Sequence, residues 1–236
     1  LAFVGDVSGG LAISVKDFWQ SFPTGLEIRD AAKATAQMTA WLWSPEAPAM
    51  DMRHYDTRAH GLNATYEDVQ PGMSVAYGVA RTSELTLFPA GEVPTKAAMV
   101  AMARAGEGRP LLVASPTYLH STGVFGVWSL PDRSTPLKKT VEDKLDSVLA
   151  FYQQQVDERH WYGFWTFGDY IHSYNNAQHV WYYDWGGHAW QNTELGVPLW
   201  VWTSFLRTGR GDVFRMAEAQ TRNTSETNVY HIGPMQ

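Results

Sequence analysis

The chain contains no cysteine, so neither a disulfide framework nor thiolate chemistry is available to it. No apolar run approaches the roughly 20 residues that a membrane-spanning helix needs. Lysine and arginine form no run, and the formal net charge is −6, which argues against a nucleic-acid backbone as partner. These absences predict a protein that binds neither nucleic acid nor membrane, although a local basic cluster would still suffice for an anionic sugar.

Aromatic residues are the one compositional excess. They make up 14% of the 236 residues, while charged residues reach only 18%, and 11 residues are tryptophan. Much tryptophan with little charge favours a carbohydrate-binding surface.

The length allows one or two domains. The chain does not begin with Met, shows no basic segment followed by an apolar one, and ends on HIGPMQ, so we interpret it as an internal segment of a longer protein.

The first part of the chain shows the alternation that is typical of β-strands. Residues 1–30, 26–43 and 78–88 alternate apolar with polar positions between turn signals. A short helix is expected over residues 95–105, capped by Thr95. These patterns predict antiparallel β-structure before residue 90.

From Pro136 onward the period becomes helical. Apolar residues at 141, 145, 148, 149, 152 and 156 form one stripe of a long helix, capped by Thr135 or by Thr140. Further helices are expected over residues 198–208 and from a capping Asp212 to about residue 222. The loop-rich residues 107–136 mark the junction, and we place a β domain at 1–130 and a helical domain at 131–236.

The stretch 160–194 concentrates the polar aromatic chemistry of the chain. It holds four of the eight histidines and five of the eleven tryptophans, but only Ile171 and Val180 among the branched aliphatic residues. Large aromatic faces among His, Asn and Asp suit a wet groove that binds sugar rings. The alternative is an aromatic packing layer whose polar groups are satisfied internally. We expect irregular structure here.

Four segments carry a family resemblance: KDFWQSFPTGLEI, WLWSPEAPAMDMRHYD, YYDWGGHAWQNTE and RNTSETNVYHIG. With them the chain resembles the exo-rhamnogalacturonan lyase family (polysaccharide lyase family 26, the YetA-like proteins). The resemblance implies an antiparallel β-sandwich portion followed by the first helical hairpins of an incomplete α/α toroid. It also implies a secreted or periplasmic enzyme acting on rhamnogalacturonan I, an anionic plant cell-wall polysaccharide.

The implied reaction is β-elimination at galacturonic acid in the pectin backbone. The C6 carboxylate must be neutralised, a base must take the C5 proton, and an acid must assist the O4 leaving group. As catalytic residues we expect His188, Tyr183, His231 and Asn192. As substrate-binding residues we expect His172, Tyr174, Asn175, Asn176, His179, Trp185, Trp190, Arg222, Arg53 and His54.

Several alternatives stay open for these residues. His188 and Asn192 are four apart and would share one face if helical, or His188 would form a structural pair with Asp184. The Tyr230–His231 dipeptide would equally serve as a loop anchor. No zinc-binding spacing occurs, so no cofactor is expected, with Ca²⁺ at Asp169, Asp184 and Glu194 as the alternative. Rival functions are a glycoside hydrolase, which needs two carboxylates, and a non-catalytic carbohydrate-binding protein.

Overall fold

A computed structural model describes residues 1–47, 77–171, 174–181, 183–184, 187–188 and 196–233 of the chain. Among these, the chain divides into two compact units. The first comprises residues 1–47 and 82–111, and the second comprises residues 77–81 and the described residues from 112 onward. The units therefore change at residues 111 and 112, within the loop-rich stretch but before the expected boundary at 130.

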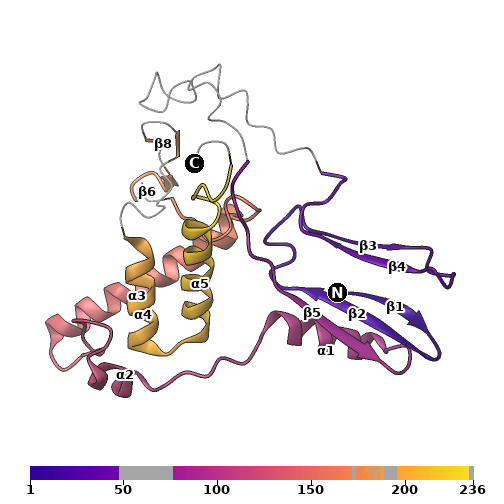
Figure 1. Ribbon diagram of the computed structural model, residues 1–236. Coiled ribbons are helices and arrows are strands. Elements are labelled where there is room, and N and C mark those ends of the chain that lie inside the picture. Colours follow the sequence, from indigo (N-terminus) through magenta and orange to yellow (C-terminus); the bar gives the residue numbers. More distant parts are fainter. Residues whose placement is uncertain (48–76, 172–173, 182, 185–186, 189–195, 234–236) are drawn as a thin grey trace. The chain divides into compact units, whose positions relative to one another are not determined.

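The first unit is built on antiparallel β-structure, as predicted. Strands β1 (Ala2–Asp6), β2 (Gly9–Val15) and β5 (Leu85–Ala90) form a sheet in the order β1-β2-β5 (Figure 1). A second pair joins β3 (Gly25–Arg29) to β4 (Gln37–Trp41). The strand expected over 78–88 begins only at Leu85.

Helix α1 (Lys96–Glu107) packs on the central strand of this sheet. The hydroxyl of Thr95 accepts a hydrogen bond from the N–H of Ala98 at 3.2 Å, which confirms the predicted cap. At the other end, the Glu107 carboxylate accepts the N–H of Asp17 at 3.0 and 3.2 Å. The helix is thereby fixed to the chain that leaves β2.

The second unit is mostly helical. Its helices are α2 (Pro116–Thr122), α3 (Pro136–Arg159), α4 (Val197–Thr208) and α5 (Gly211–Ser225). Thr135 caps α3 by accepting from the N–H of Lys138 at 3.3 Å. Helices α4 and α5 form a hairpin whose left-handed Gly209 (φ +65°) ends the first helix (Figure 1). The predicted sequence of β-structure followed by helices is confirmed.

Two local predictions were wrong, and the loop-rich residues 107–136 also contain helix α2. Residues 160–194 are not wholly irregular, because they include short strands. Helix α5 begins at Gly211, so Asp212 lies in its first turn instead of capping it, and the Asp212 carboxylate binds the Arg210 side chain and the Gln153 amide.

The core of the second unit joins α3, α4, α5 and the segment after α3. Its buried residues are Leu149, Trp161, Tyr170, Ile171, Val201, Phe205, Val213, Met216 and Ala217. The predicted stripe of α3 is buried only in its second half, because the core cluster includes α3 residues only from Leu149 onward. Val141 and Leu145 are 52% and 49% exposed. No described helix is both long enough and apolar enough to cross a membrane.

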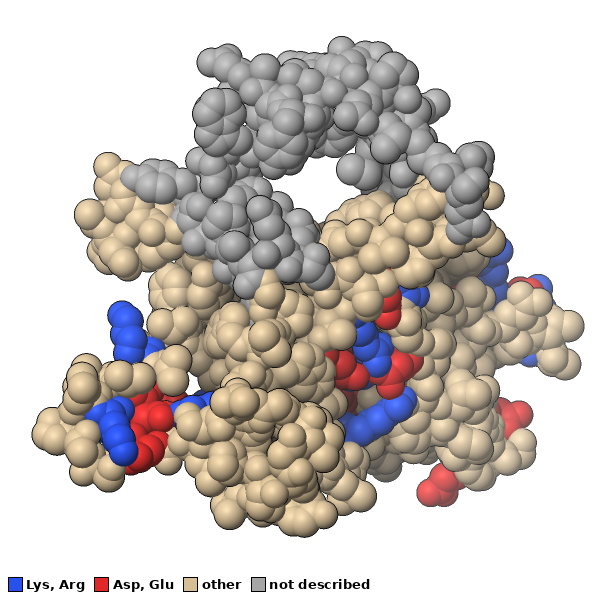
Figure 2. All heavy atoms as spheres, turned by 60° about the vertical axis from the view of Figure 1, so that its left-hand side comes forward, with Lys and Arg blue, Asp and Glu red and all other residues tan. Residues whose placement is uncertain are grey.

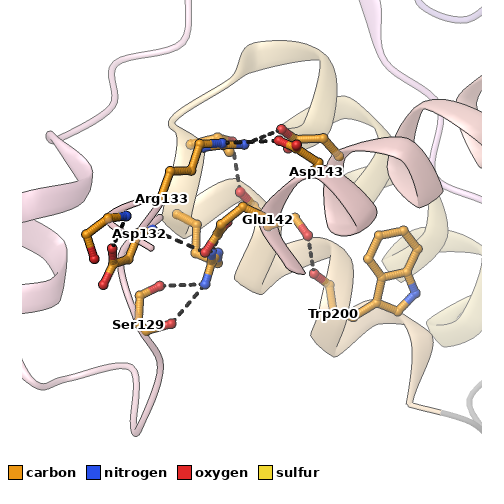
Figure 3. A network of polar contacts seen from close by, with 11 residues as sticks. Ser129, Asp132, Arg133, Glu142, Asp143 and Trp200 are labelled. Carbon is orange, nitrogen blue, oxygen red and sulfur yellow. Dashed lines mark hydrogen bonds and ion pairs between the residues drawn. The ribbon is translucent and has the colours of Figure 1, made fainter. Parts of the chain in front are cut away.

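A buried ion pair joins α3 to α4. The Nη2 of Arg207 lies 2.5 Å from both carboxylate oxygens of Glu142, and its Nη1 donates to the carbonyl and hydroxyl of Ser129 at 2.8 and 3.0 Å (Figure 3). The N–H of Asp132 donates to Glu142 at 3.2 Å. One guanidinium therefore connects two helices and the loop that precedes α3.

The segment after α3 approaches α5 closely. The Asn223 side chain, fully buried in α5, donates to the carbonyl oxygen of Trp165 at 2.8 Å. Gly168 has φ +101°, and a Cβ placed there would lie 2.1 Å from the carbonyl oxygen of Ala219. Only glycine allows both the backbone conformation and this contact.

We expect Gly168→Ala to destabilise the protein by at least about 2 kcal/mol, since overpacking costs about 1–3 kcal/mol and a left-handed backbone costs about 1–2 kcal/mol. Gly123→Ala is the matched control, because Gly123 also has positive φ (+66°) but a Cβ added there would meet no atom within 4 Å. Urea unfolding of both variants provides the measurement. Equal losses would contradict the importance of the close contact.

The Glu142 pair predicts an acid-sensitive stability. The hydrogen bond from Arg207 is the main reason that the pKa of Glu142 lies below its ordinary value of 4.5. A lowered pKa in the folded state stabilises the fold above pH 4.5, and this stabilisation is lost as the pH falls through the folded value. We expect Glu142→Gln to flatten the loss of stability at acid pH, as measured by urea unfolding between pH 3 and 7.

The exposed pair of Asp143 with Lys139 provides the control for that experiment. Asp143→Asn should change stability little at neutral pH, because solvent screens exposed ion pairs. Arg207→Ala should destabilise strongly, because it leaves the Glu142 carboxylate buried without its partner. If Glu142→Gln loses as much stability between pH 7 and pH 3 as the wild type, other carboxylates cause the acid sensitivity.

Candidate functional site

A small hairpin in the aromatic-rich stretch carries four of the predicted binding residues. Its strands are β6 (Tyr174–Asn175) and β7 (Val180–Trp181), and the loop between them holds Asn176 and His179. The Tyr174 ring lies 4.9 Å from the Trp181 ring and 5.0 Å from the Phe151 ring of α3, measured between centroids. The hairpin therefore rests on helix α3 through aromatic contacts.

The buried amide of Gln155 in α3 adds polar contacts to this packing. Its Oε1 accepts from the indole N–H of Trp181 at 3.0 Å and from the Nε of Arg159 at 3.3 Å. Its Nε2 donates to the carboxylate of Glu158 at 2.7 Å. Because a buried amide is costly to leave without partners, Gln155 fixes the orientation of the Trp181 ring.

Asn175 shapes the loop of the hairpin. Its Oδ1 accepts from the N–H groups of Ala177 at 2.8 Å and Gln178 at 3.1 Å, and its Nδ2 donates to the Gln178 side chain at 3.3 Å. This is the local bonding by which asparagine stabilises turns. His179 follows in a left-handed conformation with φ +55°. Such a conformation is unfavourable for a non-glycine residue and is common at functional sites.

The loop brings two titratable groups together. The hydroxyl of Tyr174 lies 3.3 Å from the Nδ1 of His179, and the His179 side chain is exposed to solvent. When Nδ1 carries no proton, it accepts the phenolic hydrogen of Tyr174. The pair is thus able to take up a proton from a molecule bound against the hairpin.

A second hairpin follows directly. Strand β8 (Tyr183–Asp184) pairs with β9 (Gly187–His188), and the register places Tyr183 opposite His188 and Asp184 opposite Gly187. Two expected catalytic residues are therefore register partners. His188 lies on a strand, so it has no helical face to share with Asn192.

Two further predicted residues have structural partners. Arg222 forms an ion pair with Glu218, one helical turn away, at 3.0 Å. The Nε2 of His231 lies 3.0 Å from the carbonyl oxygen of Glu226, and its backbone N–H donates to the carbonyl of Gly78 at 2.7 Å. Asn176 is exposed. The other predicted site residues lie outside the described ones: Arg53, His54, His172, Trp185, Trp190 and Asn192.

Charged groups of both signs lie next to one another on the face that Figure 2 shows, and large areas between them carry no charge. No group of three His, Asp or Glu side chains among the described residues is arranged to hold a metal ion.

Tyr170 is buried beside Asp169, and this burial is the main reason that its pKa lies far above the ordinary range. Tyr170 therefore acts as a neutral core residue.

Sequence reasoning missed Gln155 and Arg159. Both belong to the polar positions of a regular helix, where local periodicity gives no sign of a contact with a hairpin about 20 residues further along the chain. The one available signal was the position of Arg159 at the end of the predicted helix, directly before the aromatic-rich stretch.

Comparison with known proteins places the chain among related sequences. Residues 1–104 match the family model of the PcRGLX-like protein central beta sandwich domain, and residues 109–236 match that of the PcRGLX-like protein C-terminal alpha/alpha toroid domain. The chain is 43% identical over 233 residues to the uncharacterized protein YetA of Bacillus subtilis (strain 168). That match covers 99% of the chain and 27% of the length of the relative.

We expect Asn175→Ala to loosen the hairpin loop, because it removes the acceptor of two backbone N–H groups and the loss of such a side-chain bond costs about 1 kcal/mol. Amide hydrogen exchange at Ala177 and Gln178 should become faster. Asn176→Ala is the control, since no hydrogen bond joins the exposed Asn176 side chain to the described loop residues. Unchanged exchange in Asn175→Ala would contradict this account of the loop.

Proposed function

The chain belongs to the PcRGLX-like family, and on that basis we propose that it is part of a polysaccharide lyase that cleaves the rhamnogalacturonan backbone of pectin by β-elimination at galacturonic acid. Membership of the family and the resemblance of the sequence support the class of reaction. The observation that carries the proposal is the contact between the hydroxyl of Tyr174 and the Nδ1 of His179, which lie 3.3 Å apart on the aromatic hairpin β6–β7.

The chemistry of elimination needs such a pair. A base removes the C5 proton, the electron pair left on C5 forms the C4–C5 double bond, and the C4–O4 bond breaks with its electrons on O4. We propose that the Tyr174 oxygen takes the C5 proton while its own proton passes to the Nδ1 of His179. The aromatic rings beside Tyr174 offer flat faces against which a sugar ring packs.

O4 must receive a proton when its bond to C4 breaks. In galacturonic acid the C5 hydrogen and O4 lie on opposite faces of the ring, so the acid is a different group from the base. We propose that Tyr183 or His188 of the second hairpin supplies this proton. Their register pairing supports this assignment, as does the start of their hairpin two residues after Trp181.

The expected surroundings of the enzyme follow from its substrate. We propose that rhamnogalacturonan I is the partner and that the reaction uses no metal cofactor, with a side-chain cation neutralising the carboxylate. We also propose a secreted or periplasmic location, since a cell-wall polymer lies outside the cytoplasm.

The test is an assay of the full-length protein on rhamnogalacturonan I with and without EDTA. We expect new unsaturated uronate ends, detected by their ultraviolet absorbance, and unchanged rates in EDTA. Tyr174→Phe and His179→Ala should each lower kcat by about 10²-fold or more, because positioned acid–base groups contribute about 10²–10⁴-fold. His188→Ala should have a similar effect if His188 is the acid.

Tyr162→Phe is the matched control, because the hydroxyl of Tyr162 donates to Asp157 of α3. Circular dichroism must show the same helical content in every variant. Release of reducing ends without unsaturation would indicate a hydrolase instead, and binding without any new ends would indicate a carbohydrate-binding protein.

A further inference from the structure

We propose that Arg159 is the residue that binds the carboxylate of the sugar, an inference that rests on the proposed function for the identity of that sugar as galacturonic acid. Arg159 is the last residue of α3, and it is not among the site residues predicted from the sequence. Its place beside the aromatic hairpin and its unused charge support the proposal.

The position of Arg159 follows from a shared hydrogen-bond acceptor. Its Nε donates to the Oε1 of Gln155 at 3.3 Å, and the same oxygen accepts the indole N–H of Trp181 at 3.0 Å. The Trp181 ring in turn lies 4.9 Å from the Tyr174 ring. The guanidinium therefore lies near the indole N–H of Trp181, the ring that packs against Tyr174.

Most other cations of the helical unit are already neutralised. Carboxylates pair with Arg133, Lys138, Lys139, Arg207, Arg210 and Arg222. Arg159 has no such partner among the described residues, although Glu158 is its neighbour in sequence. The Glu158 carboxylate accepts instead from the side-chain amides of Gln154 and Gln155. The positive charge at the end of α3 is therefore available to a ligand.

The free donors of Arg159 match a carboxylate. Gln155 engages only Nε, so the N–H groups of Nη1 and Nη2 remain to bind both oxygens of a planar anion. A carboxylate bound in this way loses the charge that would otherwise oppose removal of the C5 proton. Gln155 is then a positioning residue, because one amide oxygen orients both the guanidinium and the indole.

Calorimetric binding measurements on the full-length protein test the proposal. The probes are a rhamnose–galacturonic acid disaccharide and its methyl ester, which lacks the negative charge. We expect Arg159→Ala to weaken binding of the free acid by about 10- to 100-fold, as for loss of a charge-assisted hydrogen-bond pair, and to leave binding of the ester within about threefold. Arg159→Lys should restore only part of the affinity.

Arg215→Ala is the matched control. Arg215 is also an exposed arginine of the helical unit without an ion-pair partner among the described residues, but it lies on α5. Gln155→Leu, with helical content verified by circular dichroism, should weaken binding of both probes because it releases Trp181, and should weaken binding of the acid more because it also releases Arg159. Equal losses in Arg159→Ala and Arg215→Ala, or an Arg159→Ala variant that binds like the wild type, would overturn the assignment.

The outcomes for the site and for the proposed function are separable. If the wild type binds the free acid through Arg159 but forms no unsaturated ends, the lyase proposal fails and the carboxylate site stands. If the wild type forms unsaturated ends while Arg159→Ala retains both affinity and turnover, the carboxylate site fails alone. A wild type that binds neither probe and cleaves no polymer overturns both.

Discussion

The hydrogen bond between the indole of Trp181 and the amide of Gln155 determines where the candidate site lies. The hairpin β6–β7 has two residues in each strand, and a hairpin of that size has little stability of its own in water. It is ordered because Trp181 and Tyr174 pack on α3 and because the buried Gln155 amide accepts the indole N–H. Any change that releases Trp181 would therefore displace Tyr174 and His179 together.

Helix α3 is itself held by polar contacts near both ends. Glu142, in its second turn, forms an ion pair with Arg207 of α4. Gln155, in its penultimate turn, accepts hydrogen bonds from the side chains of Trp181 and Arg159. A buried ion pair contributes less net stability than its short distances suggest, because desolvation opposes the attraction. Its consequence is specificity, since only one placement of α4 against α3 satisfies both the guanidinium and the carboxylate. The site is thus positioned by satisfied polar groups as much as by apolar packing.

The elements of the fold were largely readable from local signals, since strand alternation, helical periodicity and the Thr95 and Thr135 caps each depend on neighbouring residues. The errors arose where longer-range contacts decide. Asp212 has the chemistry of a cap, but Arg210 and Gln153 bind its carboxylate inside the first turn of α5. The apolar stripe of α3 is regular in sequence, yet Val141 and Leu145 stay half exposed because the described core begins at Leu149.

The amino-acid sequence was enough to show that residues 160–194 are rich in groups able to bind sugar, and its resemblance indicated the family to which the chain belongs. It also placed Tyr174, Asn175 and His179 among the binding residues, but as separate positions. The folded chain was needed to show that Tyr174 meets His179 across a turn, that Tyr183 pairs with His188 in a strand register, and that Arg159 lies near Trp181. The physical reason is that each pairing depends on a turn conformation or on the buried Gln155 amide, which is 26 residues from Trp181. Neither leaves a periodic signal in the chain.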